Sequence, residues 1–535
     1  KLTSITSYRE YDNEYGQDVD FSGADIIYLP DDGTNFNKFE TITHETRLNG
    51  ETGWVNWLFG VYYSNEDIDR QQRVTFGTEA ESFLSLHRAG PSPLALRVGL
   101  GLGALTPAFT GNTGDTDHYL QNSESFAAFT HNVFHLTDDL DFIAGVRWTT
   151  ETKEFQATYL TDPQNGCTAM EAAFGLDPSR QAASLGLPDL NQRGIALACL
   201  PFARNALDVF TAAAPHLQER TEDEFSGIAT LAYQFNSNLN TYASYSRGHK
   251  AGGFNLDRAF SDAQGSIVSP ATFPAGPPPV QTVRAPDTSF ESELVDAYEL
   301  GLKMASDDNT FQMNVAGFYQ DFQNFQLNTF TGISFIVTSV PEVISQGVEV
   351  ETFWSPFRDF STNLGVAYTD ARYGDDLGSV TTPGSFLDRN RGLFALPGER
   401  LTHSPEWTVT GGFDYSFPFI DTLTARLHMD GRWQSEMNTG SNLDPRKVQD
   451  AYAVFGAKIG FYSEDEWFGL EFFARNLFDE SYINTAFDSP LQGTAMCVNA
   501  LSGNVQCQAG SESTSTIDAF VGEPRMLGAT LRIRN

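Results

Sequence analysis

Long apolar runs, a leader sequence and basic residues are what this sequence lacks. No stretch of about 18 consecutive apolar residues occurs, so the chain has no transmembrane helix. No basic, apolar and small-residue leader stands at Lys1, so we expect no signal peptide in these residues. Only 33 lysines and arginines stand against 69 acidic residues, which gives a formal net charge of −36. A field of that sign repels nucleic acid, so we expect no nucleic-acid partner.

Motifs for catalysis and for metal binding are also missing. The nine histidines form neither an HExxH pattern nor a pair at helical spacing, which argues against a metalloenzyme. No GxSxG nucleophile motif is present. Residues 99–104 fit the GxGxxA pattern of dinucleotide-binding loops, but Pro91 and Pro93 precede them and no βαβ unit surrounds them. We therefore expect a flexible external loop there, no cofactor, no metal and no catalytic residue.

Cysteine is scarce, with four residues in 535. Cys167 and Cys199 lie in one long polar segment, and Cys497 and Cys507 lie in another. Four cysteines allow three connectivities, and we favour the local pairing within each segment. Because no CxxC spacing occurs, we expect disulfides formed in an oxidising compartment and not a zinc or redox site.

Aromatic residues and alternating patterns are what the sequence has in abundance. Aromatic residues make up 13% of the chain, with 43 Phe and 19 Tyr, as two aromatic girdles at membrane interfaces would require. Within residues 423–434, one side carries Leu423, Ala425, Leu427, Met429 and Trp433, and the other carries Thr424, Arg426, His428, Asp430, Arg432 and Gln434. Residues 55–63 and 311–320 alternate in the same way. Long strands with one charged face need a wet interior, which lipid outside and water inside provide.

Segments with a period of two residues predict an all-β chain of about sixteen strands. They lie near residues 2–11, 39–48, 54–64, 122–135, 140–160, 223–235, 239–250, 292–304, 309–326, 336–354, 360–372, 405–416, 422–436, 450–462, 467–482 and 524–534. We expect an antiparallel transmembrane β-barrel of the outer-membrane type.

The connections between these strands alternate between tight turns and long segments. The long segments lie near residues 12–38, 65–121, 161–222, 251–291, 373–404, 437–449 and 483–523, and one short exception lies near 327–335. Outer-membrane barrels have short periplasmic turns and long extracellular loops. We therefore expect the long segments and both cysteine pairs outside the cell, and the C-terminus in the periplasm.

Four motifs in the second half of the chain resemble one family. Residues 240–255 read NTYASYSRGHKAGGFN, residues 298–303 read YELGLK, and residues 345–351 read SQGVEVE. Near the end, NLFDESY at residues 476–482 is followed by GEPR at 522–525. In this order the motifs are similar to the barrel of TonB-dependent outer-membrane receptors, and the resemblance covers the chain from about Tyr242 to its end.

The resemblance implies parts that this chain does not show. Family members have an N-terminal plug domain with a TonB box and a barrel of about 22 strands, so we expect the plug and about six first strands to be absent from this chain and present in the native protein. Members usually end on an aromatic residue, whereas this chain stops at Asn535.

The resemblance also implies a function. The family imports scarce solutes actively across the outer membrane of Gram-negative bacteria, most commonly a ferric siderophore or a similar metal chelate, although cobalamin and saccharides are also carried. The implied partners are the TonB complex, the small-molecule ligand, outer-membrane lipid and lipopolysaccharide.

Two groups of residues are candidates for solute contact. Arg426, His428 and Arg432 belong to the inward-facing side of their strand, where contact with a plug or with water is the alternative. Arg247, His249 and Lys250 lie where the strand at 239–250 enters its loop, and there they could meet an anionic ligand. The acidic run at residues 369–376 is expected to be a solvated loop.

Three other interpretations remain open. A passive sixteen-stranded porin requires the strand at Leu2 to pair with the strand at Leu531. An outer-membrane barrel enzyme requires a cluster of histidine and acidic residues at the outer rim. A secreted carbohydrate-binding β-protein would be soluble without detergent.

Overall fold

Antiparallel strands make up almost all of the regular structure. The computed structural model describes residues 1–85, 110–164, 210–257, 287–330, 335–375, 396–490 and 516–534. The sixteen long strands in these ranges are β1 (Leu2–Glu14), β4 (Phe36–Thr52), β5 (Val55–Phe76), β6 (Thr113–His135), β7 (Leu140–Thr161), β8 (His216–Asn236), β9 (Leu239–Lys250), β12 (Glu293–Ala305), β13 (Phe311–Phe330), β14 (Phe335–Phe357), β15 (Phe360–Tyr373), β16 (Trp407–Ile420), β17 (Leu423–Gln434), β20 (Tyr452–Ser463), β21 (Phe468–Arg475) and β24 (Met526–Ile533). All sixteen predicted strands are therefore confirmed, in the predicted order.

Shorter elements lie in the long connections. They are β2 (Gln17–Asp18), β3 (Ile27–Leu29), β10 (Gly253–Phe254), β11 (Ser289–Phe290), β18 (Met437–Asn438), β19 (Val448–Gln449), β22 (Ile483–Asp488), β23 (Ile517–Val521), the helix α1 (Ala80–Leu84) and the 3-10 turn η4 (Pro445–Lys447). Neither helical element in the described ranges, nor any other there, is long and apolar enough to cross a bilayer.

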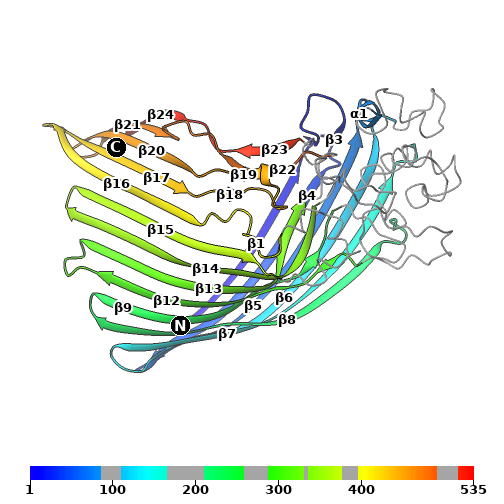
Figure 1. Cartoon of the computed structure of the whole chain (residues 1–535). Coiled ribbons are helices and arrows are strands. Elements are labelled where there is room, and N and C mark those ends of the chain that lie inside the picture. The colour runs from blue at the N-terminus through cyan, green and yellow to red at the C-terminus, as the bar shows by residue number, and fades with distance from the viewer. Residues whose placement is uncertain are drawn as a thin grey trace.

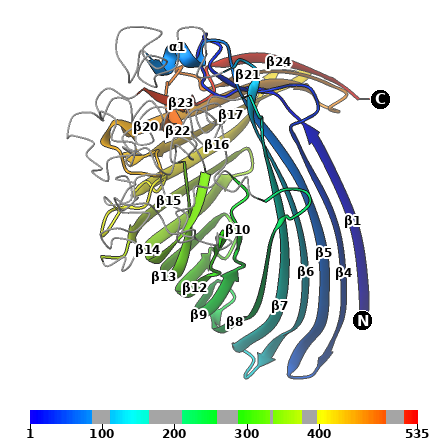
Figure 2. The ribbon, with the colours of Figure 1, turned by 90° about the vertical axis from the view of Figure 1, so that its right-hand side faces the viewer.

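The long strands form one curled sheet around a hollow. Each strand pairs with its neighbours in chain order, and β2 and β3 join the same sheet, which has 18 strands in the described residues. In Figure 2 the sheet runs from β1 through β7 and β8 and then upward through β12 and β15 to β24. The fold is a transmembrane antiparallel β-barrel of the outer-membrane type.

Tight and long connections lie at opposite ends of the sheet, as predicted. The turns of two to five residues follow β4, β6, β8, β12, β14, β16 and β20. They gather at the left in Figure 1, whereas the long connections lie at the right. Since β1 runs away from the tight-turn end and β24 runs toward it, both ends of the described chain lie at the tight-turn end. The short exception falls between β13 and β14, partly outside the described residues.

Several strands extend farther into the predicted loops than expected. β5 continues to Phe76 and β6 begins at Thr113, although residues 65–121 were predicted to be loop. Residues 65–73 read NEDIDRQQR, which is polar on both faces, so the period of two cannot be recognised although the pairing with β6 continues. Conversely, the strand predicted at 467–482 ends at Arg475, because Asn476 has a positive φ of 45° and begins a turn.

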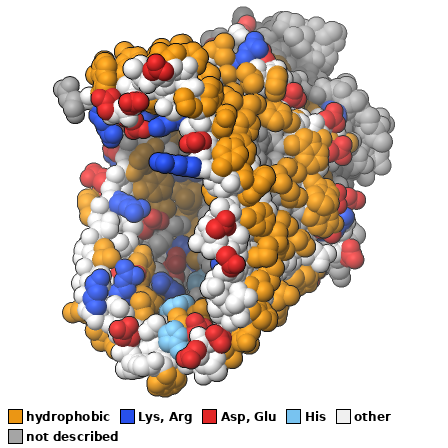
Figure 3. Space-filling view, turned by 90° about the vertical axis from the view of Figure 1, so that its left-hand side faces the viewer, with side chains coloured by type: hydrophobic (Ala, Val, Ile, Leu, Met, Phe, Trp, Pro, Cys, Tyr) orange, Lys and Arg blue, Asp and Glu red, His pale blue; other side chains and the backbone are white. Residues whose placement is uncertain are grey.

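The two faces of the sheet differ in the way that the alternation predicted. Large apolar side chains point outward and stay exposed, among them Phe59 at 55%, Leu300 at 65% and Leu527 at 73%. On β5 the outward apolar positions run from Val55 to Tyr63, close to the length that a tilted strand needs to cross the hydrocarbon core. Seen from the tight-turn end, charged side chains line a hollow, and apolar side chains cover much of the outer surface (Figure 3).

The buried apolar clusters lie at the long-connection end and not in the barrel centre. One cluster contains Tyr119, Phe155, Ala157, Tyr159 and Phe254, and the other contains Leu327, Val340, Val343, Tyr373 and Leu396. Both clusters pack the ends of strands against residues of the long connections. Within the described residues, the middle of the barrel has no such cluster.

The two outermost strands each have one partner. β1 pairs with β4, and β24 pairs with β21. The pairing of the strand at Leu2 with the strand at Leu531, which a sixteen-stranded porin requires, is not formed among the described residues. The four cysteines and the glycine-rich residues 99–104 lie outside the described ranges, so the disulfides and that loop stay predictions.

Candidate functional site

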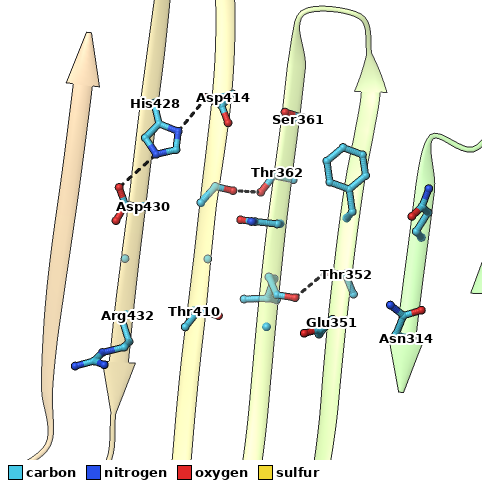
Figure 4. Close-up of a pocket in the computed structure, with 18 of the residues that line it drawn as sticks. Asn314, Glu351, Thr352, Ser361, Thr362, Thr410, Asp414, His428, Asp430 and Arg432 are labelled. Carbon is cyan, nitrogen blue, oxygen red and sulfur yellow. Dashed lines mark hydrogen bonds and ion pairs between the residues drawn. The ribbon is translucent and has the colours of Figure 1, made fainter. Parts of the chain in front are cut away.

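Polar hollows on the inner wall are the candidate functional site. One, the His428 hollow, is a space of about 840 Å³ over β13 to β17. Its polar lining includes Gln312, Asn314, Glu351, Ser361, Asn363, Thr410, Asp414, His428, Asp430 and Arg432. Figure 4 shows most of these side chains, which lie on β13, β14, β15, β16 and β17. The hollow exists because alternate residues of each strand face the lumen and Gly365 adds no side chain, since a Cβ there would lie 2.7 Å from the Thr410 hydroxyl.

His428 lies between two carboxylates. Its Nδ1 is 2.9 Å from Oδ1 of Asp414 on β16, and its Nε2 is 3.3 Å from Oδ1 of Asp430 on β17 (Figure 4). The two contacts fix the orientation of the ring at the edge of the hollow.

Arg432 connects the His428 hollow to a long connection. Its Nη2 donates to the Tyr452 hydroxyl at 2.9 Å. Tyr452 in turn stacks on Tyr482, with ring centroids 4.4 Å apart, and Tyr482 also lines the hollow. The guanidinium is therefore held by an aromatic pair that reaches the connection between β21 and β24.

Arg426 makes different contacts from His428 and Arg432. It forms an ion pair with Glu466 in the turn after β20, and its guanidinium lies over the Tyr462 ring, 4.5 Å from the centroid. The hydrogen bond from Arg426 holds the pKa of the Glu466 carboxyl below its ordinary value. Arg426 thus ties the tight-turn end together, and it does not line the His428 hollow.

The structure separates the members of the second predicted group. Arg247 shares the outer face with Tyr245 and binds Asp296 of β12 at 3.1 Å. Lys250 is exposed at the end of β9, opposite Glu293. His249 lines a different polar hollow. The structure therefore does not bring Arg247, His249 and Lys250 together on one surface.

The hollow that includes His249, here called the Arg147 hollow, lies on the wall of β4 to β7. It measures about 410 Å³ and is lined by Thr41, Tyr62, Ser64, Glu66, Ser123, Ser125, Arg147, Thr149, Glu151, Lys153 and His249. The sequence reasoning missed Arg147, Glu66 and Lys153. A signal was present, because Arg147 stands between the outward residues Val146 and Trp148 and so had to point inward.

The chain after β9 enters the lumen because β8 and β9 separate. Their pairing ends at Gly227 opposite Arg247, and beyond it β9 pairs with β12 alone. Lys153 donates to the Gly252 carbonyl at 2.7 Å, and the Gly252 amide donates to Oε2 of Glu222 at 3.0 Å. This segment carries His249 to the hollow's edge.

Nothing in the described ranges resembles a metal centre. No three His, Cys, Asp or Glu side chains in those ranges are grouped as ligands of one ion. The His428 hollow contains one imidazole that already contacts two carboxylates, which is an arrangement for holding a side chain in place.

Comparison with known proteins identifies the fold's relatives. A family model for the TonB dependent receptor-like β-barrel matches residues 1–477. The chain is similar to the ferric yersiniabactin uptake receptor FyuA from Yersinia pestis, with a TM-score of 0.62 and 13% identity, over 99% of this chain and 58% of that one. It is also similar to the siderophore receptor PiuA from Acinetobacter baumannii, with a TM-score of 0.57 and 15% identity, over 91% of this chain and 59% of that one.

A third similar structure is a metal transporter. The copper transporter OprC has a TM-score of 0.52 and 13% identity, over 99% of this chain and 62% of that one. The chain thus spans less than two thirds of the length of these solved proteins. At identities this low, the structural similarity establishes a shared fold and no more. The family model covers most of the chain. The chain belongs to the TonB-dependent receptor family and corresponds to its β-barrel domain.

Proposed function

We propose that this chain is the barrel of a receptor that imports a scarce solute actively across the outer membrane of a Gram-negative bacterium, driven by the TonB complex. The observation that carries the proposal is a wall with an apolar outer face, a charged inner face and its long connections at one end. Such a wall separates lipid from a wet lumen. Membership of the family supplies the dependence on TonB.

The solute that we propose is a ferric siderophore or a similar metal chelate. Of the similar solved structures, one is named as a ferric yersiniabactin uptake receptor, one as a siderophore receptor and one as a copper transporter. A lumen lined by amide, hydroxyl and charged groups suits a polar solute of this kind.

The unpaired edges of the sheet support the proposal that the whole receptor contains more strands. In hydrocarbon, each unsatisfied backbone N–H or C=O costs several kcal/mol, so a spanning sheet needs every edge paired. The outer edges of β1 and β24 have no partner in the described residues. Further strands between these edges, about six in number, would close the barrel around a plug.

The same arrangement supports an orientation. We place the tight turns in the periplasm, where TonB acts, and the long connections outside the cell, where the two cysteine pairs would form disulfides. The outward apolar side chains would contact lipid and lipopolysaccharide.

Uptake measurements test this function. A deletion strain and the same strain carrying the full-length gene are given radiolabelled iron as a series of ferric siderophores. We expect at least one chelate to enter only the complemented cells, and to stop entering when the proton motive force is collapsed. Equal uptake of every chelate by both strains would refute metal-chelate import, and uptake that survives collapse would favour the porin.

A further inference from the structure

Arg147 is a luminal guanidinium that meets no carboxylate in the described part of the chain. Its Nε donates to the Thr149 hydroxyl at 3.1 Å, and its Cζ lies 5.2 Å from the Tyr62 ring centroid and 5.5 Å from that of Phe129. Arg220 on the neighbouring strand β8 provides a contrast. Arg220 pairs with both Glu222 and Glu291. Arg432 also meets no carboxylate among the described residues, but its Nη2 donates to the Tyr452 hydroxyl, whereas neither terminal nitrogen of Arg147 has a hydrogen-bond partner there.

The surroundings hold this side chain in one place. Phe129 lies flat on the wall because residue 60 is glycine, where a Cβ would overlap the ring. Two aromatic faces attract a guanidinium through their ring quadrupoles, and the Thr149 hydroxyl occupies Nε. The terminal Nη1 and Nη2 groups are left to form the planar fork that binds carboxylates at two points.

The rest of the Arg147 hollow has the matching chemistry. It presents the hydroxyls of Ser64, Ser123, Ser125 and Thr149, and the last three residues are at most 8% exposed. Its own carboxylates are already engaged. Glu151 pairs with Lys153 at 2.6 Å, and Glu66 accepts from the Thr41 hydroxyl at 3.2 Å.

His249 supplies an independent sign that a polar partner is missing. It lines the same hollow, and its buried Nδ1 has no hydrogen-bond partner among the described residues. A buried ring nitrogen without a partner is unfavourable, and a bound polar group would supply the missing hydrogen bond.

We propose that the Arg147 hollow is an oxyanion-binding site. The terminal amino groups of Arg147 bind a carboxylate or a similar planar oxyanion, and the surrounding hydroxyls and His249 bind the oxygen atoms around it. On the proposed function, this oxyanion belongs to the solute in passage. An acidic side chain from elsewhere in the whole receptor offers the same chemistry, and the test separates the two sources.

The test measures the reactivity of Arg147 in the purified full-length receptor. Phenylglyoxal modifies accessible guanidinium groups, and peptide mass spectrometry compares its adducts at Arg147 and Arg47. Arg47 is a matched control because it stands in the same luminal row, opposite Gly60, and already binds Glu45 at 3.4 Å. Citrate is the carboxylate probe, glycerol is the uncharged probe, and about 1 M NaCl screens ion pairs.

The outcomes decide both the site and the source of the oxyanion. Citrate should slow modification of Arg147 severalfold, while glycerol has no effect and Arg47 does not change. Slow modification without citrate that about 1 M NaCl accelerates would assign the oxyanion to the receptor's own acidic side chain. A rate at Arg147 that none of the three additions changes would overturn the proposal.

Transport provides the second measurement. Arg147→Gln should lower the uptake rate of the chelate that the receptor carries about tenfold, the effect of one charge-assisted hydrogen bond, and Arg47→Gln should not. If the unaltered receptor carries no chelate, the proposed function fails, and the citrate measurement still decides whether the site exists.

Discussion

Asp308 shows how single side chains fix the tight-turn end. In the turn after β12, its Oδ1 accepts from the Ser306 hydroxyl at 2.7 Å, the Thr310 amide at 3.1 Å and the Thr310 hydroxyl at 2.8 Å. These hydrogen bonds lower the pKa of Asp308 from 3.8 to about 2. A carboxyl with a depressed folded pKa stabilises the fold above its unfolded value and loses that contribution as the pH falls through the folded one.

We therefore expect Asp308→Asn to flatten the stability profile in acid. The asparagine oxygen can still accept hydrogen bonds, but the side chain does not titrate. The urea midpoint of the full-length receptor in detergent should fall between pH 3.8 and about 2 in the original protein and fall less in the variant. Parallel curves for both proteins over this range would contradict the expectation.

Lys447 and Asp488 form a buried ion pair between two long connections. The side chains are 3% and 2% exposed, with Nζ 3.2 Å from Oδ1, and Asn442 contacts both partners. Removing one partner of a buried pair leaves the other charge buried without a partner and costs roughly 3–5 kcal/mol.

Lys447→Met should therefore loosen the contact between these two connections. The Ala486 amide, which donates to the Thr439 carbonyl at 3.0 Å across it, should exchange with deuterium at least about a hundredfold faster. The double variant Lys447→Met with Asp488→Leu should recover most of the loss. Lys38→Met is the control, because its pair with Asp12 at 3.8 Å is exposed and worth at most about 1 kcal/mol. Unchanged exchange in Lys447→Met would refute the structural role.

At the residue scale, the sequence predicts which side of the wall a side chain faces, because odd and even positions of a strand face opposite sides. Arg426, His428 and Arg432 were predicted to face inward because they alternate with Leu427 and Met429, and that is where they lie. Arg247 and His249 were grouped with Lys250 as ligand contacts, and although both share the parity of Tyr245, only Arg247 faces outward with it. His249 enters the lumen only because β8 and β9 separate, which no local pattern in the sequence reveals.

At the scale of elements, aromatic rings lying over glycines recur along the wall. Gly301 on β12 lies opposite Tyr242 on β9, and the tyrosine ring occupies the place where a Cβ would stand. The ring then lies along the wall, and its hydroxyl donates to Glu299. Without the glycine, the ring would have to rise into the lumen.

Gly301→Ala should consequently destabilise the barrel by about 1–3 kcal/mol, the usual cost of overpacking. The matched control is Gly317→Ala on the neighbouring strand β13, where the nearest atom to an added Cβ is 3.9 Å away. Samples of both variants are incubated at a series of temperatures and run on detergent gels without boiling, and the fraction that migrates as folded protein is measured. A control as unstable as Gly301→Ala would show that the ring contact is not the cause.

Some properties of the strands could be predicted from the sequence and others could not. Strand existence and order were predictable because the hydrocarbon imposes an alternation on each crossing. Strand length was not, because beyond Tyr63 on β5 water lies on both sides and no periodic pattern is required. The small ladders β2–β3, β10–β11, β18–β19 and β22–β23 were missed because pairs of two to six residues carry no periodic signal.

At the scale of the whole molecule, a receptor barrel and a porin differ in what pairs with the outer edges of β1 and β24, which have no partner among the described residues. Cysteines at Leu2 and Leu531 of the full-length protein should not form a disulfide, because we expect further strands between them. Cysteines at Leu470 and Leu531, which are opposite each other on β21 and β24, are the positive control. Efficient cross-linking of Leu2→Cys to Leu531→Cys, read from gel mobility under oxidising conditions, would favour closure by sixteen strands.

The direction of the two edge strands sets an arithmetic rule for any larger ring. β1 points away from the tight-turn end and β24 points toward it, so the two strands are already antiparallel. Strands inserted between them while every contact stays antiparallel must come in pairs. A ring completed with an odd number would force one parallel contact, so a full-length structure with such a total would require a different closure from the one proposed here.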